Sequence, residues 1–200
     1  MNRHIALIGW IAAWTGVVLA PVHALARFAT EQGKIDLESG VVRAWAEPAA
    51  ERLRILLDWS DPDTVYLTYG KVWFPIFVAA GLCAVAAYRA RTPAGFEKAA
   101  WIVSLAGLGL STLAVFGDYY TPWIDQSFTF LGMPGLLLGV LGGLPLGVLW
   151  LRRGLRPKIT GWLLVLWIPL FVLLSSVIAM GAAFLPVIFA WASAARRAGQ

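Results

Sequence analysis

The chain has 200 residues, of which 60% are hydrophobic and only 14% are charged, and its mean hydropathy is +0.73. This composition excludes an ordinary soluble domain and predicts an all-α, polytopic transmembrane helical bundle, with residues 1–200 forming a single integral membrane domain. A net charge of +5 would suggest nucleic-acid binding in a soluble protein. Here the basic residues lie in gaps between apolar runs, so we expect no nucleic-acid partner.

The positive charges predict the orientation of the chain, because Lys and Arg accumulate in cytoplasmic loops. Segment 24–70 has five basic residues against eight acidic ones, and segment 118–130 has no Lys or Arg, so both are expected outside. The N-terminus and the C-terminus are expected in the cytoplasm, and the excess of Arg over Lys favours a bacterial inner membrane. The segments expected inside contain a single acid, Glu97, and the following basic residues: Arg3, Arg89, Arg91, Lys98, Arg152, Arg153, Arg156, Lys158, Arg196 and Arg197.

Four apolar runs have the length that a helix needs to cross about 30 Å of hydrocarbon, and none contains Lys, Arg, Asp or Glu. They are Ile5 to Val22, Val72 to Tyr88, Ala99 to Gly117 and Leu131 to Leu151. The first run also has the basic start of a cleavable export signal. We favour a retained anchor, because Trp10 and Trp14 are unusual in a signal core. The chain is tryptophan-rich, and most of its tryptophans fall near the predicted membrane surfaces.

The last apolar run, Thr160 to Ala195, would measure about 54 Å as one helix, which is longer than the bilayer is thick. Arg196 and Arg197 favour a cytoplasmic end, so we divide the run into two crossings and predict six spans. The alternative is five spans, with the last segment lying at the membrane surface. The predicted crossings are Thr160 to Leu174 and Ala179 to Ala195, with an outer turn near Ser175-Ser176 and with Pro169 and Pro186 distorting the two helices.

Glycines recur every four residues in the fourth run, at Gly135, Gly139, Gly143 and Gly147. Small residues at this spacing let a neighbouring helix approach until the backbones touch. The third run has a matching set of small residues, Ser104, Gly107, Ser111 and Ala114. We therefore expect the two helices to pack as an antiparallel hairpin. A homo-oligomer or a partner membrane subunit that packs on the same glycines is the alternative.

The segment 24–70 is long enough to form an extracytoplasmic helical cap. Apolar residues recur in it at helical spacing, from Val42 and Trp45 to Leu56, and Pro48 is expected in the first turn of a second helix. Asp58, Asp61 and Asp63 are close enough in sequence to suggest calcium ligands. A helix start capped by Ser60 or Asp61, with Pro62 in its first turn, explains the same residues, so no metal is expected.

A second polar cluster follows the third run and is the candidate for a functional site. Its acids have the chemistry to hold a cation or transfer protons, and its rings suit an apolar or cationic ligand. The candidate residues, with others expected at the same membrane surface, are Asp118, Asp125, His23, Lys71, Tyr69 and Trp123. The same residues also suit a helix start and the outward charge bias, so a structural role is the alternative.

The supply of residues excludes several chemistries and leaves two functional hypotheses. Only His4 and His23 are present, at opposite ends of one predicted helix, and Cys83 is the single cysteine, so neither a bis-histidine haem nor a dithiol is expected. No cofactor is therefore expected. The first hypothesis is a non-catalytic protein in the lipid bilayer that binds a lipid, a small apolar molecule or partner subunits through a glycine-lined bundle. The second is a small membrane enzyme or transporter with a polar site at its outer face.

Overall fold

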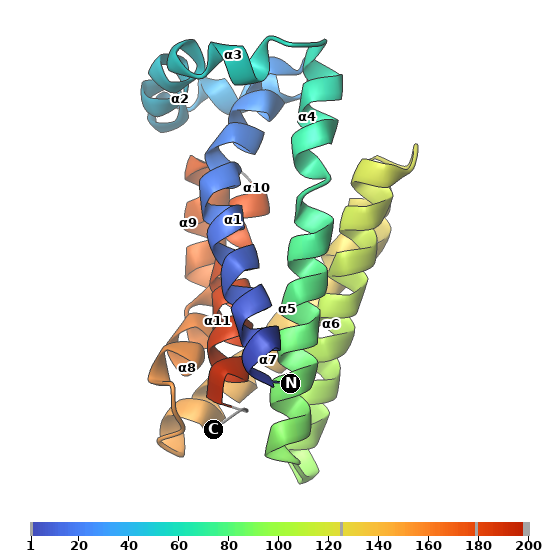
Figure 1. Ribbon diagram of the computed structural model, residues 1–200, viewed down its shortest axis with the longest axis vertical. Helices are drawn as coiled ribbons and strands as arrows, with labels where there is room; N and C mark the ends of the chain where they lie inside the picture. The colour runs from blue at the N-terminus through green and yellow to red at the C-terminus, as the bar shows by residue number, and fades with distance from the viewer. Residues whose placement is uncertain (1, 125, 179, 198–200) are drawn as a thin grey trace.

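The computed structural model describes residues 2–124, 126–178 and 180–197, and this part of the chain folds into helices without a strand. Four stretches of helix are long and apolar enough to cross a membrane, and a bent pair of helices makes a fifth if it counts as one span. The fold is therefore all-α, with helices that suit a membrane-spanning protein (Figure 1). The four are α1 (Asn2–Ala29), α4 (Pro62–Gly70) with α5 (Trp73–Arg91), α6 (Gly95–Tyr120), and η2 (Phe128–Gly132) with α7 (Met133–Arg152).

The second span starts earlier than its apolar run, because α4 continues it outward. Pro62 is the first residue of α4, and the carboxylate of Asp61 accepts a hydrogen bond of 3.0 Å from the backbone N–H of Thr64. This bond satisfies one of the N–H groups that the first turn of a helix leaves without a partner. The predicted helix cap at Asp61 is confirmed.

The C-terminal apolar run is broken where Pro169 requires it. Helix α8 (Lys158–Val165) and helix α9 (Trp167–Val177) meet at a bend of 65°. Pro169 has no N–H to donate to the carbonyl of Val165, four residues earlier, and its ring crowds that carbonyl. The predicted turn at Ser175-Ser176 is wrong. Both serines lie in the last turn of α9, which continues to Val177, and their hydroxyls donate to the carbonyl of Val172.

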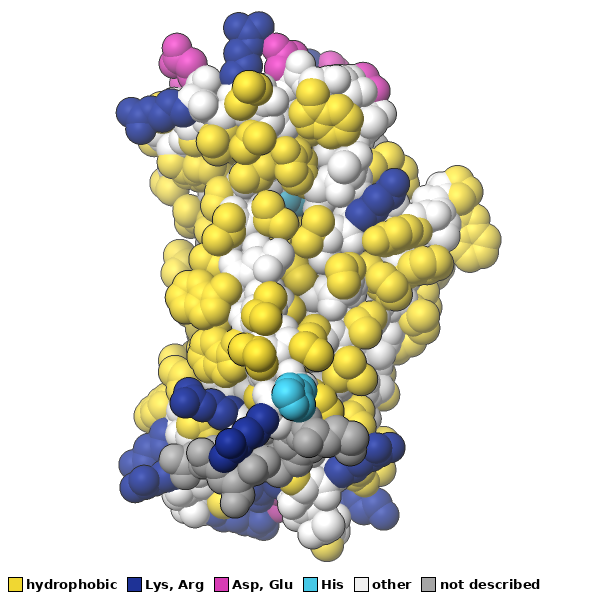
Figure 2. Space-filling view, in the orientation of Figure 1, with side chains coloured by type: hydrophobic (Ala, Val, Ile, Leu, Met, Phe, Trp, Pro, Cys, Tyr) yellow, Lys and Arg dark blue, Asp and Glu magenta, His cyan; other side chains and the backbone are white. Residues whose placement is uncertain are grey.

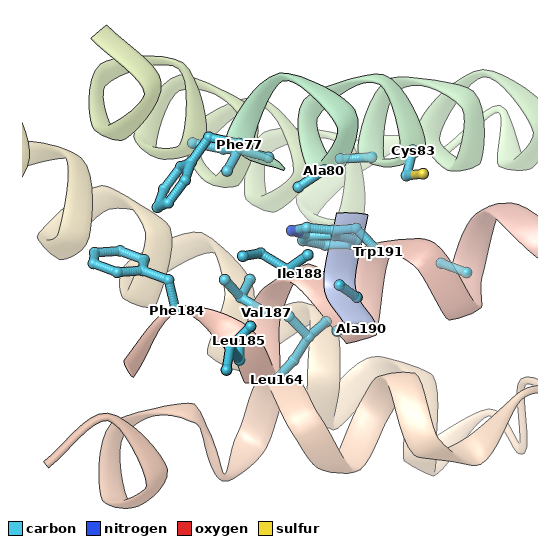
Figure 3. Packing of buried hydrophobic residues seen from close by; sticks show 14 of the residues in the cluster. Phe77, Ala80, Cys83, Leu164, Phe184, Leu185, Val187, Ile188, Ala190 and Trp191 are labelled. Atoms are coloured by element: carbon cyan, nitrogen blue, oxygen red, sulfur yellow. The ribbon is translucent and has the colours of Figure 1, made fainter. Parts of the chain in front are cut away.

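Beyond α9 the chain turns back through α10 (Met180–Ala183) and α11 (Leu185–Arg197), and the start of the predicted crossing at Ala179 lies outside the described residues. Helix α11 packs among α1, α5 and α8, and the Thr160 hydroxyl of α8 donates to the Ala190 carbonyl at 3.2 Å. Trp191 is buried against Trp101 of α6, and Figure 3 shows Ile188 and Trp191 between the surrounding helices. The C-terminal helix therefore supplies the centre of the core.

Short helices lie across one end of the bundle: η1 (Gly33–Glu38), α2 (Gly40–Arg52) and α3 (Arg54–Leu57), at the top of Figure 1. Val42 and Ala46 of α2 are buried against Phe28 of α1, and the Trp45 indole donates to the Val177 carbonyl at 2.7 Å. The break predicted at Pro48 is wrong, because α2 continues through it to Arg52. Its apolar stripe keeps the helix seated on the bundle despite one lost hydrogen bond.

The glycines of α7 divide among three neighbouring helices, α6, α8 and α9. A Cβ added to Gly135 or Gly142 would lie 2.7 Å from the Ser111 nitrogen or 2.6 Å from the Ala100 oxygen, both in the backbone of α6. A Cβ on Gly147 would lie 2.9 Å from the Gly161 oxygen of α8, and one on Gly143 or Gly139 would meet the ring of Trp167. Helices α6 and α7 thus form a close antiparallel hairpin, and these glycines already pack against helices of the same chain.

Basic side chains gather at the end of the bundle opposite α2, at the bottom of Figure 2, while hydrophobic side chains cover the middle of that face. At this end Glu97 is buried, and its carboxylate accepts hydrogen bonds from Arg91, at 3.0 and 3.1 Å, and from Arg153. The Arg91 guanidinium also lies 4.8 Å from the centre of the Trp150 ring. Glu97 therefore joins α5, α6 and α7 at the basic end.

Candidate functional site

A buried histidine is the centre of the candidate site. His23 of α1 is only 3% exposed, and its two ring nitrogens lie 3.2 Å from the Trp73 indole nitrogen and 3.1 Å from the Tyr119 hydroxyl. An indole N–H can only donate, so Nδ1 of His23 must accept and carries no proton. The imidazole is therefore neutral, with its proton on Nε2, which donates to the Tyr119 hydroxyl.

The hydrogen-bond network continues from Tyr119 to Tyr66. Their hydroxyl oxygens are 3.3 Å apart, and the Tyr66 ring stacks on His23 with centroids 5.0 Å apart. Either hydroxyl can donate in this contact, because the Tyr119 oxygen that accepts from His23 has a second lone pair. The Arg27 guanidinium also lies beside the Tyr66 hydroxyl. The network therefore reaches from Trp73 to Tyr66 and Arg27.

Glycine at position 70 permits the approach of Tyr119. A Cβ added there would fall within the Tyr119 ring. Gly70 ends α4, so this contact holds the outer part of the second span against α6. A side chain at this position would separate Tyr119 from His23.

The network borders a cavity of about 490 Å³. Phe77 and Phe184 form an aromatic part of its wall, with ring centroids 5.0 Å apart, and Phe171 packs on Phe184 at 5.5 Å. The other lining residues show that the cavity extends from α5 and α10 to η1 and α2. The lining residues used below are His23, Arg27, Asp36, Tyr66, Val115 and Asp118.

Charged groups line the cavity beside the aromatic network. Arg27 of α1 donates from Nε to the Asp36 carboxylate of η1 at 3.0 Å, and both side chains are partly exposed. Asp118 accepts a hydrogen bond of 3.1 Å from the backbone N–H of Phe128. The cavity therefore combines an apolar wall with a polar end that carries donors and acceptors.

The structure brings together two of the residues that the sequence singled out and separates three others. His23 and Asp118 both line the cavity. Lys71 lies against Tyr120, with its ammonium 5.9 Å from the ring centre, and Tyr69 donates to the Leu56 carbonyl. Trp123 is 65% exposed and lines none of the cavities described here. Asp125 lies outside the described residues.

Sequence reasoning missed Arg27, Asp36 and Trp73 and gave Tyr66 no role. A signal was present, because His23 and Arg27 are four residues apart and share a helix face, and Tyr66 and Trp73 are seven apart. The pairing of these faces depends on tertiary contacts. Among the described residues, no three His, Cys, Asp or Glu side chains lie close enough to hold a metal ion.

Comparison of the chain with family models, with curated proteins and with solved structures gives no match. The function must therefore be argued from the geometry of the cavity.

Proposed function

We propose that this protein binds a small amphipathic molecule in the cavity beside His23. The observation that carries the proposal is the composition of the cavity wall, which joins Phe77 and Phe184 to the hydrogen-bonded network of His23. A volume of about 490 Å³ lies within the roughly 300–1,000 Å³ that is usual for small-molecule sites. The ligand has an apolar body and a head that accepts a hydrogen bond from Tyr66.

The cavity replaces the glycine-lined faces as the binding region in this proposal. The glycines of α7 are covered by α6, α8 and α9, so a ligand or a second subunit would have to displace helices of the same chain. The cavity needs no such displacement. This favours a small ligand over assembly through the glycine stripe.

A six-span topology fits this placement. Arg3 of α1 and Arg196 of α11 line the same hollow at the basic end of the bundle, so the chain crosses the bundle an even number of times between them. The stretch from Met180 to Arg196 is shorter than the other spans but is apolar. We infer that it makes the sixth crossing, and that the cavity end carrying α2 faces outward because it is the less basic end.

The alternative is a small membrane enzyme or transporter that uses the same polar end. The presence of Asp118 and a neutral His23 on one cavity wall favours it, because such groups can accept and return a proton. The two functions differ in the fate of the ligand. Binding alone leaves its mass unchanged, whereas catalysis yields a product mass that Asp118→Asn abolishes.

The test is native mass spectrometry of the protein extracted in a mild detergent, with two matched variants of α6. Val115→Phe places a ring in the cavity, and Leu113→Phe places the same ring on a side chain that is 55% exposed on the outer surface. We expect a discrete bound mass in the wild type and in Leu113→Phe, and its loss in Val115→Phe. Tyr66→Phe should lower the bound fraction because it removes the hydroxyl that binds the head of the ligand. Equal occupancy in the two α6 variants, or no bound mass in the wild type, would overturn the proposal.

A further inference from the structure

A second hollow, of about 500 Å³, lies at the basic end of the bundle, between the start of α1 and the end of α11. Its lining among the described residues is Arg3, Ala6, Leu7, Trp10 and Arg196. No acid lies among these residues, and neither arginine forms an ion pair or a hydrogen bond with the described part of the chain. Two guanidinium groups that share a hollow, with no counter-charge in the described part of the chain, favour an anion between them.

The Trp10 ring also lines this hollow. Its Nε1 is buried and has no hydrogen-bond partner among the described residues, while the ring packs edge-on against Phe189 at 5.5 Å. Buried donors without an acceptor are rare. Trp10 follows Arg3 by seven residues, a rise of about 10 Å, and its side chain leans back toward the start of the helix. The ring therefore lies between the arginines and the apolar middle of the bundle.

The hollow continues into an apolar surface. Leu7, Ile11, Trp14 and Val18 of α1 are each more than half exposed and recur at intervals of four, three and four residues. This spacing places them on one face of the helix. An occupant of the hollow can therefore extend along α1 where the bilayer would lie.

We propose that this hollow is a binding site for one acidic phospholipid. The phosphate lies between Arg3 and Arg196, the glycerol lies against the Trp10 ring, and an acyl chain follows Leu7 and Ile11. Basic pockets at the cytoplasmic side of membrane helices suit acidic head groups. The site is separate from the cavity beside His23 and stands whether or not that cavity binds a ligand.

The test compares two double variants that remove equal charge from the same end of the bundle. Arg3→Gln with Arg196→Gln changes the hollow, and Arg89→Gln with Arg152→Gln changes exposed arginines that do not line it. Each protein is delipidated in detergent, incubated with phosphatidylglycerol or with phosphatidylcholine of the same acyl chains, and examined by native mass spectrometry.

We expect the wild type to retain one phosphatidylglycerol in preference to phosphatidylcholine. The first double variant should lose that preference by at least tenfold, and the second should stay within twofold of the wild type. Val115→Phe should leave lipid retention unchanged, which separates this site from the cavity.

Three results would overturn the proposal. Equal loss in the two double variants would indicate a diffuse surface potential, and equal retention of the two lipids would remove the requirement for an acidic head group. Displacement of phosphatidylglycerol by inorganic phosphate at the same concentration would indicate a site for a free anion. If the first double variant does not fold, the single changes Arg196→Gln and Arg152→Gln give the same comparison.

Discussion

The contact between α6 and α7 predicts that Gly107→Ala destabilises the bundle while Gly109→Ala on the same helix does not. A Cβ at position 107 would lie 2.7 Å from the Gly135 carbonyl oxygen and closer still to the Gly139 nitrogen. A Cβ at position 109 would have no atom within 4 Å. The two variants make the same chemical change two residues apart, so they differ only in what the added methyl group meets.

The expected size of the effect follows from these distances. Moving the carbonyl oxygen from 2.7 Å to an ordinary contact of 3.4 Å requires the two backbones to separate, and neither can yield as a flexible side chain would. Overpacking of this kind lowers the free energy of unfolding by about 1–3 kcal/mol. Replacing Gly by Ala in a helix raises it by about 1 kcal/mol, and this gain is common to both variants. The difference between the two variants is therefore about 1–3 kcal/mol.

The single cysteine provides the assay. Cys83 is fully buried on α5, so a thiol-reactive fluorophore labels it only after unfolding. For a chain of this size, 1–3 kcal/mol corresponds to a midpoint difference of about 2–12 °C between the two variants. Equal midpoints for Gly107→Ala and Gly109→Ala would refute the claim that α6 and α7 touch through their backbones.

The other predictions concern contacts at the ends of helices. The hydroxyl and the backbone N–H of Thr64 hold the pKa of the Asp61 carboxyl below its ordinary value of 3.8. The cap of α4 therefore stabilises the fold above pH 3.8, and this stabilisation is lost as the pH falls through the lowered pKa. Hydrogen exchange at the Thr64 amide should rise in that pH range, and Asp61→Ala should raise it at neutral pH. Trp45→Phe leaves the Val177 carbonyl without its donor and should increase hydrogen exchange in α2 but not in α6. Glu97→Gln should lower the free energy of unfolding by about 1–3 kcal/mol in the Cys83 assay, because it weakens the charge-assisted bonds to Arg91 and Arg153, whereas the exposed Glu51→Gln should not change it.

Helix positions were predictable because each rests on a local property. An apolar run without charges identifies a span by its length, and the sequence Asp61-Pro62 identifies the start of α4. The bend before Pro169 follows from the missing N–H of proline, and its place follows from the rule that proline disturbs the carbonyl four positions earlier, here that of Val165, where α8 ends. Such features need no knowledge of the partner helix.

The glycine stripe shows where local reasoning becomes incomplete. Four residues of an α-helix turn about 400°, so each four-residue step moves about 40° around the axis, and Gly147 is rotated by about 120° from Gly135. Seven residues return to within about 20°, which is why Gly135 and Gly142 face the same helix. The spacing thus predicts close packing, but not that the glycines pack against three different helices.

The polar network was beyond sequence reasoning for a different reason. Its hydrogen bonds join residues that are 50, 53 and 96 positions apart, and no local pattern specifies which helix faces meet. The cavity depends further on how α9 bends and how α10 returns beside it. His23 and Asp118 could be selected as polar residues near the outer surface, but their shared cavity follows only from the packing.

The unpartnered indoles of this chain differ in whether their residues line a hollow. Trp10, Trp101 and Trp167 all have a buried Nε1 without a partner among the described residues. The rings of Trp101 and Trp167 pack on Trp191 and Phe184, and neither residue lines the cavity or the basic hollow, so their unused donors accompany aromatic packing. Trp10 differs in that its ring, which packs on Phe189, also lines the hollow that carries Arg3 and Arg196. At the other end of the bundle, the hydrogen bonds from Trp73 to Tyr66 border the cavity beside His23.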